Sequence, residues 1–138
     1  MNRTRRLFLT APVVALVLGA CGSGPQASNT EGELPMNISV NDLAARLESD
    51  KRLMVLDVRS PEEYTQDGHV PGSVLIPLPE LAMRLNEVPK DRPIACFCRS
   101  GNRSQVACDM LRQQGYTNVT NVLGGIRDWR SANLPTEY

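Results

Sequence analysis

The chain has 138 residues, of which 41% are hydrophobic and 22% are charged, and its formal net charge is zero. This length leaves room for one domain, and the composition is that of an ordinary globular protein. There is no basic helix, no zinc-like spacing of cysteine and histidine, and only six aromatic residues. The composition therefore argues against a nucleic-acid-binding protein and offers no metal site.

The first twenty residues are typical of an export signal rather than of folded structure. Arg3, Arg5 and Arg6 form a positive segment, and a short apolar run over residues 7–18 follows. That run is too short for a comfortable membrane span, and small residues end it, as at a processing site. Without this segment the chain carries 12 basic and 15 acidic residues.

The residues at the end of this segment, Leu18-Gly19-Ala20-Cys21, resemble the lipobox of bacterial lipoproteins. The resemblance implies that Cys21 is lipidated and becomes the new N-terminus, which would anchor the protein to a bacterial membrane, facing the periplasm or the exterior. An uncleaved anchor and a plain soluble signal remain the alternatives. Residues 4–9 also resemble a twin-arginine export motif, and the sequence does not choose between that route and the general one.

Residues 21–36 hold the lipidated cysteine and a stretch rich in glycine, serine and proline without apolar periodicity, which predicts a flexible tether. The folded domain is expected over residues 37–138. Its first element is an edge strand at 38–40, followed by a helix that Asn41 or Asp42 caps. Leu43, Ala44 and Leu47 fall on one face of that helix.

Short strands and helices alternate along the rest of the domain. The apolar run at 53–56 predicts a strand buried on both faces. Ser60 and Pro61 predict the start of a short helix. The chain then offers a strand at 73–76, a helix carrying Leu81, Met83 and Leu85, a strand at 93–97, a helix carrying Val106, Ala107, Met110 and Leu111, a strand at 119–123, and a last helix that Trp129 packs onto the sheet. Such alternation predicts an α/β fold with a mainly parallel five-stranded sheet covered on both faces by helices.

Cys98 stands where the strand at 93–97 passes into the following helix. The N–H groups at the start of a helix stabilise an anion, so a thiol there should have a lowered pKa and act as a nucleophile. Arg99 and Arg103 add positive charge, and Gly101 allows a tight turn. Ser100, Asn102 and Ser104 suit a turn and a helix cap. A buried structural cysteine is the simpler alternative.

Asp57 and Arg59 follow the buried strand at 53–56 and could either act on a substrate or tie loops together. We favour the supporting role, because polar clusters at strand ends commonly satisfy backbone groups. His69 is the only histidine and the only candidate base for Cys98, although its place in a turn favours a structural role.

The remaining thiols at Cys96 and Cys108 are expected to be small core residues. Cys96 and Cys98 lie two positions apart on one strand, about 6.6–6.8 Å between Cα atoms, which is at or beyond the usual limit for a disulfide. If Cys21 carries lipid, three thiols are left, and an odd number cannot all be paired.

Several segments together resemble the rhodanese family of sulfurtransferases. They are LDVRSPEEY at 56–64, GHVPGSVLIPL at 68–78, CRSGNR at 98–103 and LGGIRDW at 123–129, and with their surroundings they cover nearly everything from residue 38 onward. The resemblance implies a three-layer rhodanese-like fold. It also implies that Cys98 carries sulfur as a persulfide, with Arg99, Ser100, Gly101, Asn102 and Arg103 binding the substrate.

The resemblance also implies the reaction, which is transfer of sulfur from a donor such as thiosulfate to cyanide or a thiol, without a cofactor. The related phosphatase loops are one residue longer than the six residues from Cys98 to Arg103, so the shorter loop favours sulfur over phosphate. A lipid-anchored module whose Cys98 senses oxidants is the second candidate function, and a phosphatase is the third. We expect a monomer.

Overall fold

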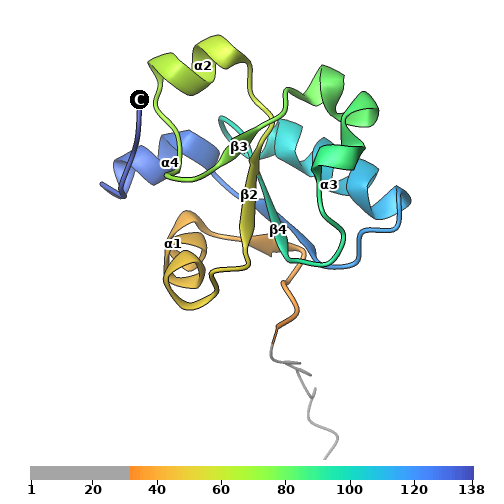
Figure 1. The fold of residues 1–138 in the computed structure, drawn as a ribbon. Helices are drawn as coiled ribbons and strands as arrows, with labels where there is room; N and C mark the ends of the chain where they lie inside the picture. The colour runs from red at the N-terminus through yellow and green to blue at the C-terminus, as the bar shows by residue number, and fades with distance from the viewer. Residues whose placement is uncertain (1–31) are drawn as a thin grey trace, which may run out of the picture.

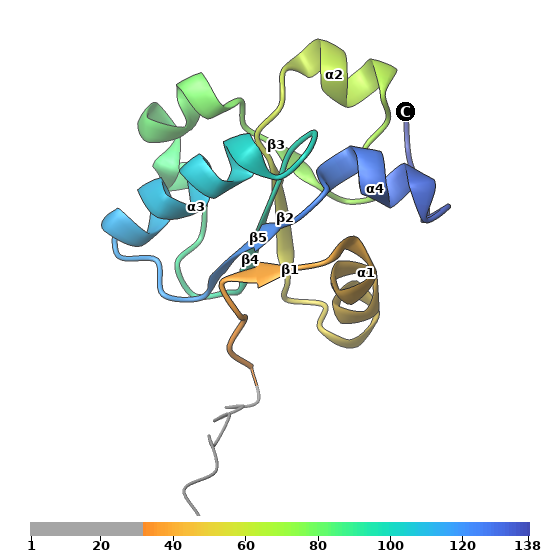
Figure 2. The same ribbon diagram turned by 180° about the vertical axis from the view of Figure 1, so that it is seen from behind.

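The computed structural model describes residues 32–138, which form a five-stranded parallel sheet between two layers of helices (Figures 1 and 2). The strands are β1 (Asn37–Ile38), β2 (Met54–Asp57), β3 (Val74–Leu75), β4 (Ile94–Phe97) and β5 (Val119–Val122). Their order across the sheet is β1-β5-β4-β2-β3, and every neighbouring pair is parallel. The predicted α/β fold and the predicted edge position of the first strand are confirmed.

Helices cover both faces of this sheet. Helices α1 (Val40–Ser49) and α4 (Gly125–Ser131) lie on one face, while α3 (Asn102–Gln113) and the 3₁₀ segments η1 (Leu78–Met83) and η2 (Leu85–Glu87) lie on the other (Figure 1). The short helix α2 (Pro61–Gln66) follows the carboxyl end of β2. No helix within residues 32–138 is long and apolar enough to cross a membrane.

The export signal, Cys21 and the tether up to residue 31 lie outside the described residues. The expectations stated for them therefore stay predictions.

The three central strands are buried along their whole length, as a parallel sheet requires. Side chains alternate between the two faces, so Leu56 and Cys96 join the cluster under α3, while Val55 and Phe97 join the cluster under α1 and α4. Trp129 lies in the second cluster with its ring edge against Phe97, which confirms that the last helix packs onto the sheet.

The N-terminus of α1 differs from its prediction by two or three residues. Ser39, rather than Asn41 or Asp42, is the N-cap: its hydroxyl accepts a hydrogen bond from the Asp42 N–H at 3.1 Å. Asp42 returns a bond by accepting from the Ser39 N–H, which completes a capping box. Asp42 is thus the partner of the cap, because it stands three positions after it.

The segment that carries Leu81, Met83 and Leu85 is not one amphipathic α-helix but the two 3₁₀ segments η1 and η2. With three residues per turn, Leu78 and Leu81 lie on the same side and pack against the core, whereas Met83 is 78% exposed. The predicted helix is therefore present as two short 3₁₀ segments, with Met83 on their exposed side.

In α3 the face toward the sheet is formed by Ser104, Ala107, Cys108 and Leu111. Val106, predicted to face the core, is 53% exposed. Successive residues of an α-helix point about 100° apart, which places Val106 nearly opposite this face. The polar residue at position 104 concealed the true phase of the helix.

Thr120 in β5 has a fully buried hydroxyl that finds no hydrogen-bond partner among the described residues. A buried unpaired hydroxyl costs free energy that an apolar group of the same shape does not. Thr120→Val is therefore expected to raise the free energy of unfolding by about 1 kcal/mol, measured by urea denaturation. A loss of stability of similar size would show that the hydroxyl has a stabilising partner.

Candidate active site

Cys98 directly follows β4, at the carboxyl edge of the sheet, and is only 1% exposed. Its sulfur accepts a hydrogen bond from the Gly101 N–H at 3.1 Å and lies 3.3 Å from the Ser104 hydroxyl. Burial raises the pKa of this thiol, but hydrogen bonds from the Ser104 hydroxyl and from the N–H groups of Ser104, Ser100 and Gly101 outweigh it. The net direction of the pKa is downward, so the geometry favours a thiolate.

The N-terminus of α4 holds the same loop from the other side. The Ile126 N–H donates to the Cys98 carbonyl at 2.9 Å, and the Arg127 N–H donates to the Arg99 carbonyl at 3.3 Å. These bonds fix the peptide groups of Cys98 and Arg99 against the start of α4. Gly125 makes the approach possible, because any Cβ there would overlap the Cys98 carbonyl oxygen.

The residues after Cys98 divide between the rim and the interior of the loop. Arg99, Ser100 and Asn102 are exposed, whereas Gly101 is buried with a φ of 103° and is the N-cap of α3. No side chain caps this helix, so the expected capping role of Ser100, Asn102 or Ser104 was wrong. Gly101, with its left-handed backbone conformation, instead directs its own N–H toward the Cys98 sulfur. Ser104 is buried in the first turn of α3.

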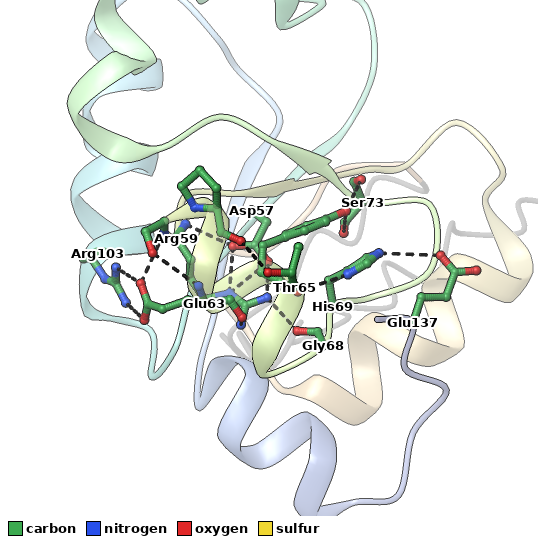
Figure 3. A network of polar contacts seen from close by, with 12 residues as sticks. Asp57, Arg59, Glu63, Thr65, Gly68, His69, Ser73, Arg103 and Glu137 are labelled. Atoms are coloured by element: carbon green, nitrogen blue, oxygen red, sulfur yellow. Dashed lines mark hydrogen bonds and ion pairs between the residues drawn. The ribbon is translucent and has the colours of Figure 1, made fainter.

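Arg103 binds Glu63 of α2. The two side chains form a bidentate ion pair, with nitrogen to oxygen distances of 2.6 and 2.7 Å (Figure 3). The hydrogen bonds from Arg103 lower the pKa of Glu63 to about 2. The positive charge of Arg103 is therefore balanced locally. Glu63 was not among the predicted site residues, although its place as the acid of the Ser60 capping box was a usable signal.

Asp57 and Arg59 form a fully buried ion pair, with Arg59 Nη2 2.7 Å from Asp57 Oδ2. Arg59 also donates to the carbonyls of Glu63 and Gly68, at 3.2 and 2.9 Å (Figure 3). These contacts join the end of β2 to α2 and to the turn that follows it, and none of them reaches Cys98. Asp57 and Arg59 thus support the helix whose Glu63 binds Arg103.

His69 is engaged at the far end of this network. Its ring stacks on Tyr64 with 3.8 Å between centroids, Nδ1 lies 3.2 Å from the Tyr64 carbonyl, and Nε2 lies 3.7 Å from the Glu137 carboxylate (Figure 3). The backbones of His69 and Glu137 also exchange two hydrogen bonds. The histidine therefore fastens the C-terminal residues to the turn before β3.

Cys96 and Cys108 are buried, and like Cys98 they are unpaired. Burial and the neighbouring Cys108 thiol hold the pKa of Cys96 well above its ordinary value. Cys96 is thus a poor nucleophile, and both residues serve as small members of the core under α3. Residues 32–138 contain no group of three or more histidine, cysteine or acidic side chains that could hold a metal ion.

Fold and site together define a class: a three-layer α/β domain in which a cysteine follows a central strand, and the six residues 98–103 run from that cysteine into the first turn of a helix, with hydrogen bonds that lower the pKa of the thiol. A profile of the rhodanese-like domain matches residues 39–132. The chain belongs to the rhodanese-like domain family.

Named relatives agree with this assignment. A sulfurtransferase of Allochromatium vinosum is 40% identical over 98 residues, covering 71% of this chain and 91% of that protein. The thiosulfate sulfurtransferase PspE of Escherichia coli is 41% identical over 75 residues, covering 53% of this chain and 70% of that protein. The crystal structure of a rhodanese-related protein from Thermoplasma volcanium superimposes with a TM-score of 0.67 at 34% identity, covering 74% of this chain and 97% of the other.

The contact between Gly125 and the loop can be tested by substitution. Gly125→Ala should distort the loop and lower the free energy of unfolding by about 3 kcal/mol, and it should slow alkylation of Cys98 at neutral pH. Gly72→Ala is the matched control, since Gly72 also has a positive φ but has open space around its Cα. That control should lose only about 1–2 kcal/mol and keep the alkylation rate; equal effects of the two substitutions would contradict the steric argument.

The ion pair between Glu63 and Arg103 predicts a pH dependence of stability. Folding lowers the pKa of Glu63, so its carboxylate adds to the free energy of unfolding. This stabilisation is fully present above the unfolded pKa of about 4.3 and is lost as the pH falls toward about 2. Compared with Glu63→Gln, the wild type should be more stable by about 1 kcal/mol near neutrality, the pair being partly exposed. Urea denaturation at several pH values should show this difference shrinking in acid; a difference independent of pH would contradict the assignment.

Proposed function

We propose that this protein is a sulfurtransferase in which Cys98 carries the transferred sulfur. The Cys98 thiolate attacks the outer sulfur of a donor such as thiosulfate, a new sulfur–sulfur bond forms, and sulfite leaves with the electron pair of the broken bond. Cyanide or a thiolate then attacks the outer sulfur of the persulfide, and Cys98 leaves as the thiolate. Electrons balance without an oxidant or a reductant.

The observation that carries this proposal is the set of hydrogen bonds that converge on the Cys98 sulfur. They lower the pKa of the Cys98 thiol and so favour the thiolate that attacks the donor. Membership of the rhodanese-like family and the named sulfurtransferase relatives support the same chemistry. Arg99, exposed at the rim, would attract an anionic donor.

Cys98→Ser should abolish both thiocyanate formation and the gain of one sulfur atom after thiosulfate treatment, because a serine hydroxyl is not ionised near neutral pH. Cys96→Ala and Cys108→Ala are the matched controls and should keep both activities while losing some stability. Intact-mass spectrometry after exposure to thiosulfate, and again after cyanide, measures both steps.

A persulfide that survives Cys98→Ser, or one that disappears in folded Cys96→Ala, would place the sulfur on another thiol. A wild-type Cys98 that forms only a sulfenic acid with peroxide and takes no sulfur from thiosulfate would favour the redox-sensing function. Turnover of an aryl phosphate faster than thiosulfate would favour a phosphatase.

We further propose that the protein is anchored to a bacterial membrane by lipid on Cys21, on the strength of the residues before this cysteine. The mature wild type should partition with membranes and carry two or more acyl chains, since one chain gives only marginal anchoring. Cys21→Ser should release the protein or leave it unprocessed. Recovery of a soluble, unlipidated wild type with a free N-terminus at Ala20 or beyond would overturn this proposal.

A further inference from the structure

The Ser104 hydroxyl lies between two hydrogen-bond acceptors. Its oxygen is 2.6 Å from Asn121 Oδ1 and 3.3 Å from the Cys98 sulfur. Asn121 Nδ2 donates to Asn37 Oδ1 at 3.2 Å, which fixes the amide with its oxygen toward Ser104. Both Ser104 and Asn121 are buried. Since a hydroxyl has a single proton, it can serve only one of these acceptors at a time.

The strength of one acceptor changes during the proposed sulfur transfer. A Cys98 thiolate is a charged acceptor and forms a strong hydrogen bond. Once Cys98 carries a second sulfur, the negative charge resides on the outer atom, and the inner sulfur becomes a neutral and weak acceptor. Asn121 Oδ1, at the shorter distance, is then the better partner for the hydroxyl.

We propose that the Ser104 hydroxyl turns between Asn121 and Cys98 during each cycle and stabilises Cys98 as the leaving thiolate. When the acceptor attacks the outer sulfur, the sulfur–sulfur bond breaks and its electron pair passes to the Cys98 sulfur. The hydroxyl donates its hydrogen bond to that new thiolate, with no proton transferred. Ser104 is thus a catalytic residue of the discharge step, and Asn121 is a positioning residue that competes for the hydroxyl.

This inference rests on the proposed function, and it predicts an asymmetry between the two half-reactions. Ser104 stabilises the free thiolate, which is the reactant of loading and the product of discharge. Ser104→Ala should therefore slow discharge of the persulfide to cyanide by about tenfold, at a pH where Cys98 is fully ionised. Loading from thiosulfate under the same conditions should be unchanged or faster. A merely structural defect would slow both steps.

The role of Asn121 is tested by asking whether its effect on the pKa of Cys98 requires the Ser104 hydroxyl. Asn121→Leu removes the competing acceptor and should lower the pKa of Cys98, measured as the midpoint of the pH dependence of iodoacetamide alkylation. Ser104→Ala should raise this midpoint by about one pH unit, and adding Asn121→Leu to that variant should change nothing further. Thr120→Val, the neighbouring residue on the opposite face of β5, should leave the midpoint at its wild-type value.

The two measurements separate this inference from the proposed function. Equal slowing of loading and discharge in Ser104→Ala would overturn the inference. So would an Asn121→Leu substitution that shifts the alkylation midpoint of Cys98 equally in the presence and in the absence of the Ser104 hydroxyl. If the wild type takes up no sulfur, the proposed function fails and the discharge role fails with it. The alkylation midpoints would still decide whether the Ser104 hydroxyl bonds to the Cys98 sulfur, because alkylation requires no sulfur transfer.

Discussion

The site depends on the contact between the start of α4 and the loop after β4. Two N–H groups of α4 bind the carbonyls of Cys98 and Arg99, and so the peptide units of the loop present their N–H groups to the sulfur. Without this orientation, burial alone would raise the pKa of Cys98 and leave a neutral thiol. Gly125 is required because only a residue without a Cβ allows the two backbones to approach so closely.

A second, polar support lies on the opposite side of the loop. The buried pair of Asp57 and Arg59 ties α2 to the end of β2, and Glu63 of α2 binds Arg103 in the first turn of α3 (Figure 3). Removing one member of a buried ion pair leaves an uncompensated charge and is costly, so a substitution of Asp57 or Arg59 alone would destabilise this support. Glu63 balances the charge of Arg103, and hydrogen bonds lower the pKa of Cys98.

Much of this arrangement could be predicted from sequence, because many of its features are determined by residues that are neighbours in the chain. The buried runs that form β2 and β4 were found by composition, and Cys98 by its place between a strand and a helix. The contacts that were missed depend on tertiary structure. Glu63 lies 40 positions from Arg103, and Asn121 lies 17 positions from Ser104, so neither pair has a periodic signal. The phase of α3 was misjudged because Ser104 is a polar residue on the buried face.

The most direct test of this account is a pH titration of the backbone amide resonances of residues 98–104 by nuclear magnetic resonance. If the loop N–H groups bind the sulfur, the amides of Gly101 and Ser104 should shift together in one transition. Its midpoint should lie below the value of about 8.5 for an ordinary cysteine and should disappear in Cys98→Ser. A midpoint at or above that value, or amides that do not respond to ionisation of Cys98, would contradict the account.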